Sequence, residues 1–262
     1  MKISHIIIGI RKKTVATLGV GMFWVVSGTR AAVLLGQASA NSGGWGSTVP
    51  TGDSAYSSFV LPLGGTITNV AWTGDVNLSY GLPGGFIVTF WSSNAGRAGT
   101  KLSSQTINGS AGATDTGNTA GIFHIYNFST SVTPFTAALG TKYYLSIVAY
   151  SAQWYWENAS NANFGGYEYA IINNQGEYFS TGGLAFTLFG TATPPSLEIS
   201  QTGSQFVVSW PISASNYVLQ TTSNLSSGSW TNITDAVNAS EFSYAYTNLA
   251  TGNMAYYRLQ QQ

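Results

Sequence analysis

The sequence predicts an all-β protein, in which a jelly-roll-like β-sandwich is followed by a small immunoglobulin- or fibronectin III-like β-sandwich. Charged residues make up only 7% of the chain and aromatic residues 14%, while Gly, Ser, Thr and Asn dominate the remainder. This mixture favours strands and turns over amphipathic helices. Apolar segments with two-residue alternation recur between Gly, Asn and Ser clusters, and no segment shows a convincing helical period.

The first 31 residues are typical of a signal peptide. The basic stretch 11–13 precedes the apolar segment 14–28, and small residues follow it. A membrane helix needs about 20 apolar residues, and here the apolar run is shorter and interrupted by Arg30. The sequence therefore predicts export to the cell surface or beyond, with cleavage after Ala31, Ala32 or Ala40. No membrane span is expected after this removal.

The charge and the cysteine content exclude several classes of protein. Five of the nine basic residues lie in the leader and all nine acidic residues follow it, so its removal leaves a net charge of −5. A mildly acidic chain without a basic patch is not expected to bind nucleic acid. The absence of cysteine excludes disulfides and Cys-zinc sites, so packed sheets must supply the stability.

The larger domain is predicted to span residues 32–190. The strands expected in it lie near 33–36, 57–61, 66–73, 85–91, 101–107, 121–128, 142–150, 153–157, 167–172 and 184–190. Segments 85–91 and 142–150 are apolar on both faces, which is typical of central strands. A Pro-Pro pair within residues 191–196 predicts an extended linker. Residues 197–262 then contain six or seven short strands, enough for a small second sandwich.

Several stretches resemble known exported domains. "SSFVLPLGGTITNVAWTGDV", "FIVTFWSSNAGRAGTKL", "KYYLSIVAYSAQWYWENAS" and "LAFTLFG" resemble a family of exported bacterial β-sandwich domains of uncharacterised role, often found on surface-sorted proteins. "VVSWPISASNYVLQTTSNLSSGSWTNIT" with "AYYRLQ" is similar to a small sandwich module that ends many exported proteins of Verrucomicrobia-like and planctomycete-like bacteria. The resemblance implies fold and location, and it supplies no catalytic residues.

Catalytic motifs are sparse in this chain. The one histidine after the leader, His124, lies in an apolar strand without a Gly-x-Ser-x-Gly motif, so we expect it to be a structural residue bonded to a neighbour. Glu157 and Glu168 bracket an aromatic hairpin and could form the carboxylate pair of a glycoside hydrolase. We expect no enzyme and no cofactor. Asp53 and Asp75, predicted to lie on turns, could help to hold a structural calcium ion, although neither has the spacing of a calcium loop.

Carbohydrate binding is the sharpest prediction. Exposed Trp and Tyr rings offer flat apolar faces to sugars, and amide or carboxylate groups nearby can bond hydroxyls. The predicted glycan-binding residues are Trp154, Trp156, Glu157, Asn158, Tyr167 and Tyr169. Strand alternation places Trp154 and Trp156 on one face and Tyr155 on the other, and at least one of these faces should be core because the preceding strand is apolar on both.

The sequence thus favours an exported, non-catalytic binding or cell-surface module with a polysaccharide or cell-surface glycan as its partner. The alternatives are a purely structural matrix or adhesion component and a glycoside hydrolase. A connected, exposed aromatic surface would favour binding, whereas interior rings would favour the structural role. The oligomeric state stays open.

Overall fold

The protein is built almost entirely of β-strands. The computed structural model describes residues 6–10, 20–22, 31–150, 153–160, 168–172, 176–180, 182–203, 205–234, 237–241, 243–249 and 255–262. Its only helical elements within these ranges are two single turns, η1 (Leu78–Tyr80) and η2 (Leu225–Ser227). In this part of the chain no helix is long and apolar enough to cross a membrane. The all-β prediction is confirmed.

The chain divides into two compact units. The larger unit spans Arg30–Thr193, and the smaller one contains Pro194–Gln262 together with Met1–Thr29. The division falls inside the segment 191–196 that the sequence predicts as a linker, although the last strand of the larger unit continues to Ala192.

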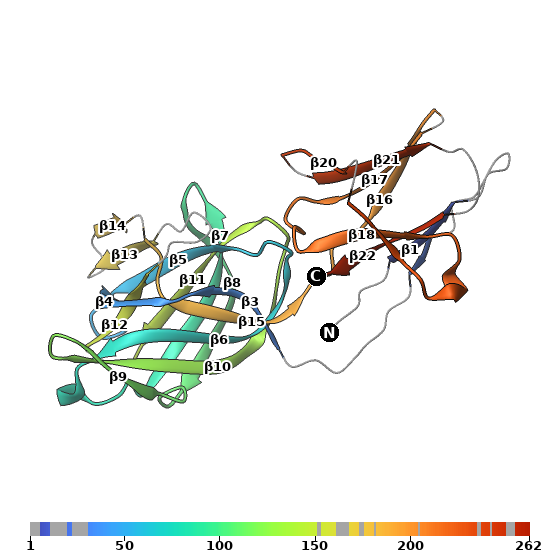
Figure 1. Ribbon diagram of the computed structural model, residues 1–262. Helices are drawn as coiled ribbons and strands as arrows, with labels where there is room; N and C mark the ends of the chain where they lie inside the picture. The colour runs from blue at the N-terminus through green and yellow to red at the C-terminus, as the bar shows by residue number, and fades with distance from the viewer. Residues whose placement is uncertain are drawn as a thin grey trace. The chain divides into compact units, whose positions relative to one another are not determined.

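Two antiparallel sheets form the larger unit (Figure 1). The first sheet has the order β3-β15-β6-β10-β9. Strand β12 pairs with the C-terminal end of β6, and β4 pairs with β12. Its strands are β3 (Ala32–Gln37), β4 (Ser39–Gly46), β6 (Gly65–Val76), β9 (Thr114–Ala120), β10 (Phe123–Ala137), β12 (Trp154–Ala159) and β15 (Phe186–Ala192). The second sheet has the order β14-β13-β5-β11-β7-β8. Its strands are β5 (Ser54–Val60), β7 (Gly85–Asn94), β8 (Arg97–Asn108), β11 (Lys142–Ala149), β13 (Glu168–Ile172) and β14 (Gly176–Ser180).

The strand order is that of a jelly roll. Four strands of each sheet, β3-β15-β6-β10 and β5-β11-β7-β8, form this pattern. Along the chain these eight strands switch sheets at each step except from β7 to β8, so that neighbours in a sheet are mostly distant in sequence. Eight strands wound in this way form the two Greek keys of a jelly-roll sandwich. Strands β7 and β11 lie inside their sheet, each paired on both sides, as their apolar faces predict.

Alternation along the strands decides what lies between the sheets. In β6, Val70 and Trp72 are buried, whereas Ala71 and Thr73 lie on the outer face and are partly exposed. The facing strand β7 contributes Phe86, whose ring centroid lies 5.0 Å from that of Trp72. Because aromatic rings bury large areas, this sandwich has a dense core without any crosslink.

The smaller unit is a second sandwich of two antiparallel sheets. One has the order β16-β17-β21-β20 and the other β19-β18-β22-β1-β2. Their bounds are β16 (Glu198–Thr202), β17 (Gln205–Pro211), β18 (Tyr217–Thr222), β19 (Thr231–Ile233), β20 (Val237–Ala239), β21 (Ser243–Leu249), β22 (Ala255–Gln261), β1 (Ile6–Ile10) and β2 (Val20–Met22). Strands β1 and β2 belong to the predicted signal peptide, so its cleavage, which stays a prediction, would remove both.

Candidate functional site

The two tryptophans predicted to stack on sugar are core residues. Trp154 and Trp156 have no exposed surface, and their rings pack against Phe86 and Phe186 respectively. A ring enclosed on both faces has no surface left for a ligand, so the prediction of a glycan platform on these residues is wrong. The predicted division of faces is confirmed, because Tyr155 lies on the opposite side of β12 and packs its half-buried ring against Phe123.

The other predicted binding residues do not form a surface either. Tyr169 is buried, stacks on Tyr56 at 4.5 Å between centroids, and its hydroxyl accepts a hydrogen bond from the Ala98 N–H. Burial raises the pKa of Tyr169. Asn158 is half-buried, and its Oδ1 is enclosed. Tyr167 and the side chain of Glu168 lie outside the described residues, and so does any pairing of Glu168 with Glu157.

The two tryptophans differ in one hydrogen bond, which makes their contributions separable. The Trp156 Nε1–H donates to the Ala185 carbonyl at 2.9 Å, whereas the buried Trp154 Nε1 has no partner within the described residues. We expect Trp156→Phe to lower the free energy of unfolding by about 1 kcal/mol more than Trp154→Phe, because only the former loses a buried hydrogen bond. Urea unfolding of both variants measures this difference, and equal losses would contradict it.

Glu157 is buried as well, and it belongs to a carboxyl pair. Glu157 has no exposed surface, and Asp75 on the neighbouring strand β6 is only 2% exposed. Tyr155 faces Asp75 in the register of β12 and β6, which places Glu157 one step further along the same outer face. The two carboxyl groups lie close enough for the negative charge of Glu157 to act on the pKa of Asp75.

A β-bulge in β4 covers this pair. Strand β4 pairs with β12 through Gly44 and again through Ser39, and the register shifts between these points. Ser39 at one end of the bulge and Ser42 and Gly43 within it direct donors at Glu157. The Gly43 N–H donates to Oε1 at 2.8 Å, the Ser39 hydroxyl to Oε2 at 2.9 Å, and the Ser42 N–H more weakly to Oε2 at 3.4 Å. Successive N–H groups of this kind form an anion-binding concavity.

These contacts assign the charge and the proton within the pair. An ionised carboxylate only accepts hydrogen bonds, and Glu157 accepts three from the bulge. Asp75 Oδ1 is enclosed without a partner in the described chain, and the raised pKa of Asp75 makes it the carboxyl group of the pair that keeps its proton more readily. Burial, followed by the negative charge of Glu157 and their hydrogen bond, raises the pKa of Asp75 to about 8.

The position of Asp75 corrects the calcium prediction for this residue. Asp75 lies within β6, not on a turn, and the donors beside it favour an anion over a cation. Asp53 does follow the turn closed by Gly52 N–H and Val49 O, and its Oδ2 accepts from the Thr51 hydroxyl. Within the described ranges no group of three or more acidic or histidine side chains is placed to hold a metal.

A polar hollow lies on the outer face of the same sheet. Its volume is about 450 Å³, within the usual range of small-molecule sites. Eight of its thirteen lining residues carry an amide or hydroxyl and none carries a charge: Gln37, Ser39, Asn41, Thr73, Thr116, Asn118, Asn127 and Thr187 are the polar ones, with Ala38, Ala71, Trp72, Phe128 and Phe186 between them. The arrangement can offer many donors and acceptors to a neutral polar ligand.

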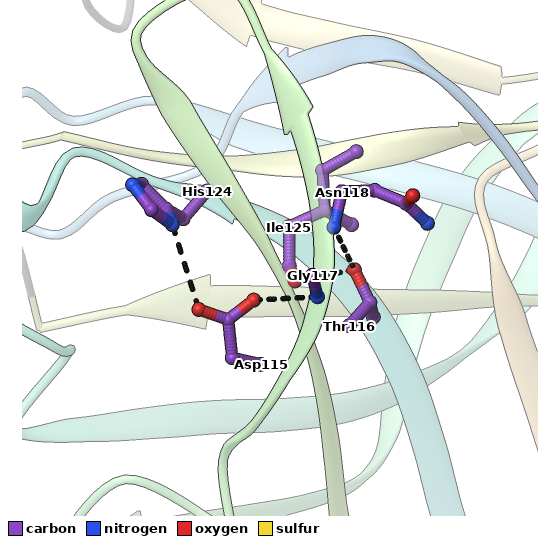
Figure 2. A network of polar contacts seen from close by, with 6 residues as sticks. All are labelled: Asp115, Thr116, Gly117, Asn118, His124 and Ile125. Atoms are coloured by element: carbon purple, nitrogen blue, oxygen red, sulfur yellow. Dashed lines mark hydrogen bonds and ion pairs between the residues drawn. The ribbon is translucent and has the colours of Figure 1, made fainter.

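Figure 2 shows the polar contacts of the β9–β10 hairpin, which contributes Thr116, Asn118 and Asn127 to the lining of the hollow. The Thr116 hydroxyl donates to the Ile125 carbonyl at 2.8 Å and accepts from the Asn118 N–H at 3.2 Å. Asp115 accepts from the Gly117 N–H and pairs with His124, whose Nδ1 lies 3.4 Å from Asp115 Oδ2. The hydrogen bond from Gly117, with a smaller contribution from His124, lowers the pKa of Asp115. His124 thus contacts a neighbouring side chain, as predicted, and its purely structural role stays a prediction.

The hollow and the carboxyl pair share one wall. Ser39, which donates to Glu157, also lines the hollow together with Asn41. Sequence reasoning missed both features. A signal for the pair existed, since Asp75 and Glu157 are each the one charged residue of their strand, whereas scattered Ser, Thr and Asn residues give no comparable signal for the hollow.

No protein-family model matches the chain, and no curated protein is similar to it.

Proposed function

We propose that the larger unit is a non-catalytic module that binds a neutral glycan in the polar hollow, carried by an exported protein. The observation that carries this proposal is the lining of the hollow, which combines eight uncharged hydrogen-bonding side chains with no charged one. The ligand is placed here and not on the tryptophans of β12, which are enclosed in the core.

The chemistry of the lining favours sugar hydroxyls over charged ligands. Amide and hydroxyl groups both donate and accept, as adjacent sugar hydroxyls do, whereas phosphate and carboxylate ligands are commonly held by Arg or Lys. Asn127 illustrates the arrangement. Its Oδ1 accepts from the Thr73 hydroxyl at 3.0 Å, which orients the amide and leaves its nitrogen able to donate to a ligand.

The carboxyl groups that lie close together support a non-catalytic role. A glycosidase holds its two carboxyls about 5 to 10 Å apart, on either side of the bond to be cut. Asp75 and Glu157 are instead buried side by side on neighbouring strands under the β4 bulge, where a sugar has no access to them. Export is proposed from the leader-like composition of residues 1–31.

A structural role is the second candidate, and one observation favours it. Trp154 and Trp156 pack in the core between the sheets, and Tyr169 packs in a smaller cluster with Tyr56 and Tyr144, so these rings stabilise the fold, as expected of a matrix or adhesion component. The two candidates differ in a measurable way, because only a binding module has a saturable site in the hollow.

The binding proposal predicts a large difference between two matched asparagines. Asn127 and Asn69 each accept one hydrogen bond from a side chain across the β6–β10 ladder, but only Asn127 lines the hollow. Asn127→Ala should weaken the binding of a neutral oligosaccharide by about tenfold, which corresponds to about 1.4 kcal/mol. Asn69→Ala should leave affinity unchanged. Titration calorimetry with cellopentaose, maltopentaose and mannopentaose measures both.

Two outcomes would count against this proposal. Binding that weakens equally in both variants would place the ligand elsewhere on the sheet. No saturable binding of any of the three oligosaccharides, nor of other neutral glycans on an array, would favour the structural role.

A further inference from the structure

We propose that Asp75 and Glu157 form a proton-dependent clasp that positions the Ser39–Gly43 wall of the hollow, so that loss of their shared proton loosens this wall and weakens ligand binding. The ligand-binding half of this inference rests on the proposed function. The clasp itself rests on the contacts of the buried pair and can be tested without a ligand.

A short chain of hydrogen bonds connects the pair to the ligand site. The Ser39 hydroxyl lies within hydrogen-bonding distance of Glu157 Oε2, at 2.9 Å, and of Asn41 Oδ1, at 3.2 Å, and it accepts from the Asn41 N–H at 2.9 Å. Both Ser39 and Asn41 line the hollow. The position of this wall therefore depends on where the Glu157 carboxylate is held.

The bulge has an unusual backbone conformation that Glu157 supports. Asn41 has a positive φ of 52° and Gly43 one of 90°, conformations that non-glycine residues seldom adopt without local support. The two backbone amides of Ser42 and Gly43 converge on Glu157. Glu157 is thus the group that organises the bulge, and it acts on the ligand site only through the bulge. We regard it as a positioning residue.

The strands that surround Asp75 bring no cation close to its carboxyl group, so a bound proton is what neutralises it. On β12 it meets Glu157 and, in register, Tyr155. On β10 its register partner is the buried, apolar Ile125, while the neighbouring His124 is paired with Asp115 of β9. The sequence of β4, "SANSGGWG", contains no titratable side chain. None of these elements brings a cation to the pair.

Loss of the proton would place two negative charges side by side in a buried site. Such charges repel strongly because little water is present to screen them. The raised pKa of Asp75, about 8, places this change at mildly alkaline pH. Below that pH the acid donates to Glu157 and the bulge is held. Above it, the repulsion between the two carboxylates is reduced most easily when water enters beneath the bulge, and this moves Ser39 and Asn41.

The full-length chain tests the clasp directly by NMR between about pH 6 and about pH 10. We expect the Asp75 carboxyl carbon to titrate with a midpoint near 8, and the amide signals of Ser42 and Gly43 to shift and exchange faster through the same midpoint. An Asp75 midpoint below about 5, or amides that do not follow it, would overturn the proposal. This measurement needs no variant and no ligand.

Asp75→Asn provides the matched variant, since an Asn amide can donate to Glu157 at every pH. For the tightest binder among cellopentaose, maltopentaose and mannopentaose, we expect wild-type affinity to fall by about tenfold or more from about pH 6 to about pH 10. In Asp75→Asn the affinity should change by less than about twofold. Equal pH dependence in both proteins would overturn the coupling. If no oligosaccharide binds at either pH, the proposed function fails, and the NMR titration still decides whether the clasp exists.

Discussion

Replacing Gly44 by Ala is expected to disrupt the fold of the larger unit. A Cβ at this position would lie 1.8 Å from the Trp156 carbonyl oxygen and 2.8 Å from the Glu157 Cα. Both atoms belong to backbone, which cannot move aside as a flexible side chain can. Strand β4 would have to separate from β12, and the bulge would then lose its contacts with Glu157. We expect a loss of about 3 kcal/mol or more in the free energy of unfolding, or no folded protein.

Gly46→Ala is the control for this prediction. Gly46 lies on the same ladder, opposite Tyr155, but a Cβ there would meet only ordinary contacts, at 3.4 Å from Asp53 Oδ2 and 3.7 Å from the Tyr155 ring. Neither glycine has a positive φ, so both substitutions are compatible with the backbone. Urea unfolding followed by tryptophan fluorescence compares the two. Similar stabilities would show that β4 does not need its close approach to β12.

Most strands of the jelly roll could be predicted because their sequences alternate or are apolar throughout. Each of the ten strands expected between residues 33 and 190 overlaps an observed strand. The sequence did not reveal β4, β9 and β14. Strand β9, "TDTGNTA", has no large apolar residue because it lies at a sheet edge and is mostly exposed. Strand β4, "SANSGGWG", is rich in Gly because it approaches β12 closely.

The candidate site was less accessible to sequence reasoning than the fold. Alternation correctly separated Trp154 and Trp156 from Tyr155, yet it could not decide which face was core. Glu157 was singled out as a partner of aromatic rings, but its actual partner, Asp75, lies 82 positions earlier in the chain. Their contact depends on the pairing of β12 with the far half of β6 and on a bulge in a strand that the sequence did not predict.

The free energy of unfolding of the wild type should fall as pH rises, and that of Asp75→Asn should not. In the unfolded chain Asp75 loses its proton near its usual pKa of 3.8, whereas in the folded protein it does so at about 8. Between these values the folded state binds the additional proton, so rising pH favours unfolding. The stabilisation is complete below about pH 4 and is lost as pH rises to about 8, with a slope of up to about 1.4 kcal/mol per pH unit.

Because Asn does not titrate, Asp75→Asn should lack this slope and become more stable than wild type near pH 8, in contrast to most substitutions of buried residues. Urea unfolding at intervals from about pH 4 to about pH 9 measures the difference between the two proteins. Asp115→Asn is the control of opposite sign. The pKa of Asp115 is lowered, so its contribution is present above its usual pKa and is lost as pH falls. If the difference in free energy of unfolding between wild type and Asp75→Asn stays constant with pH, Asp75 is ionised in the folded protein. The burial of two negative charges would then need another explanation.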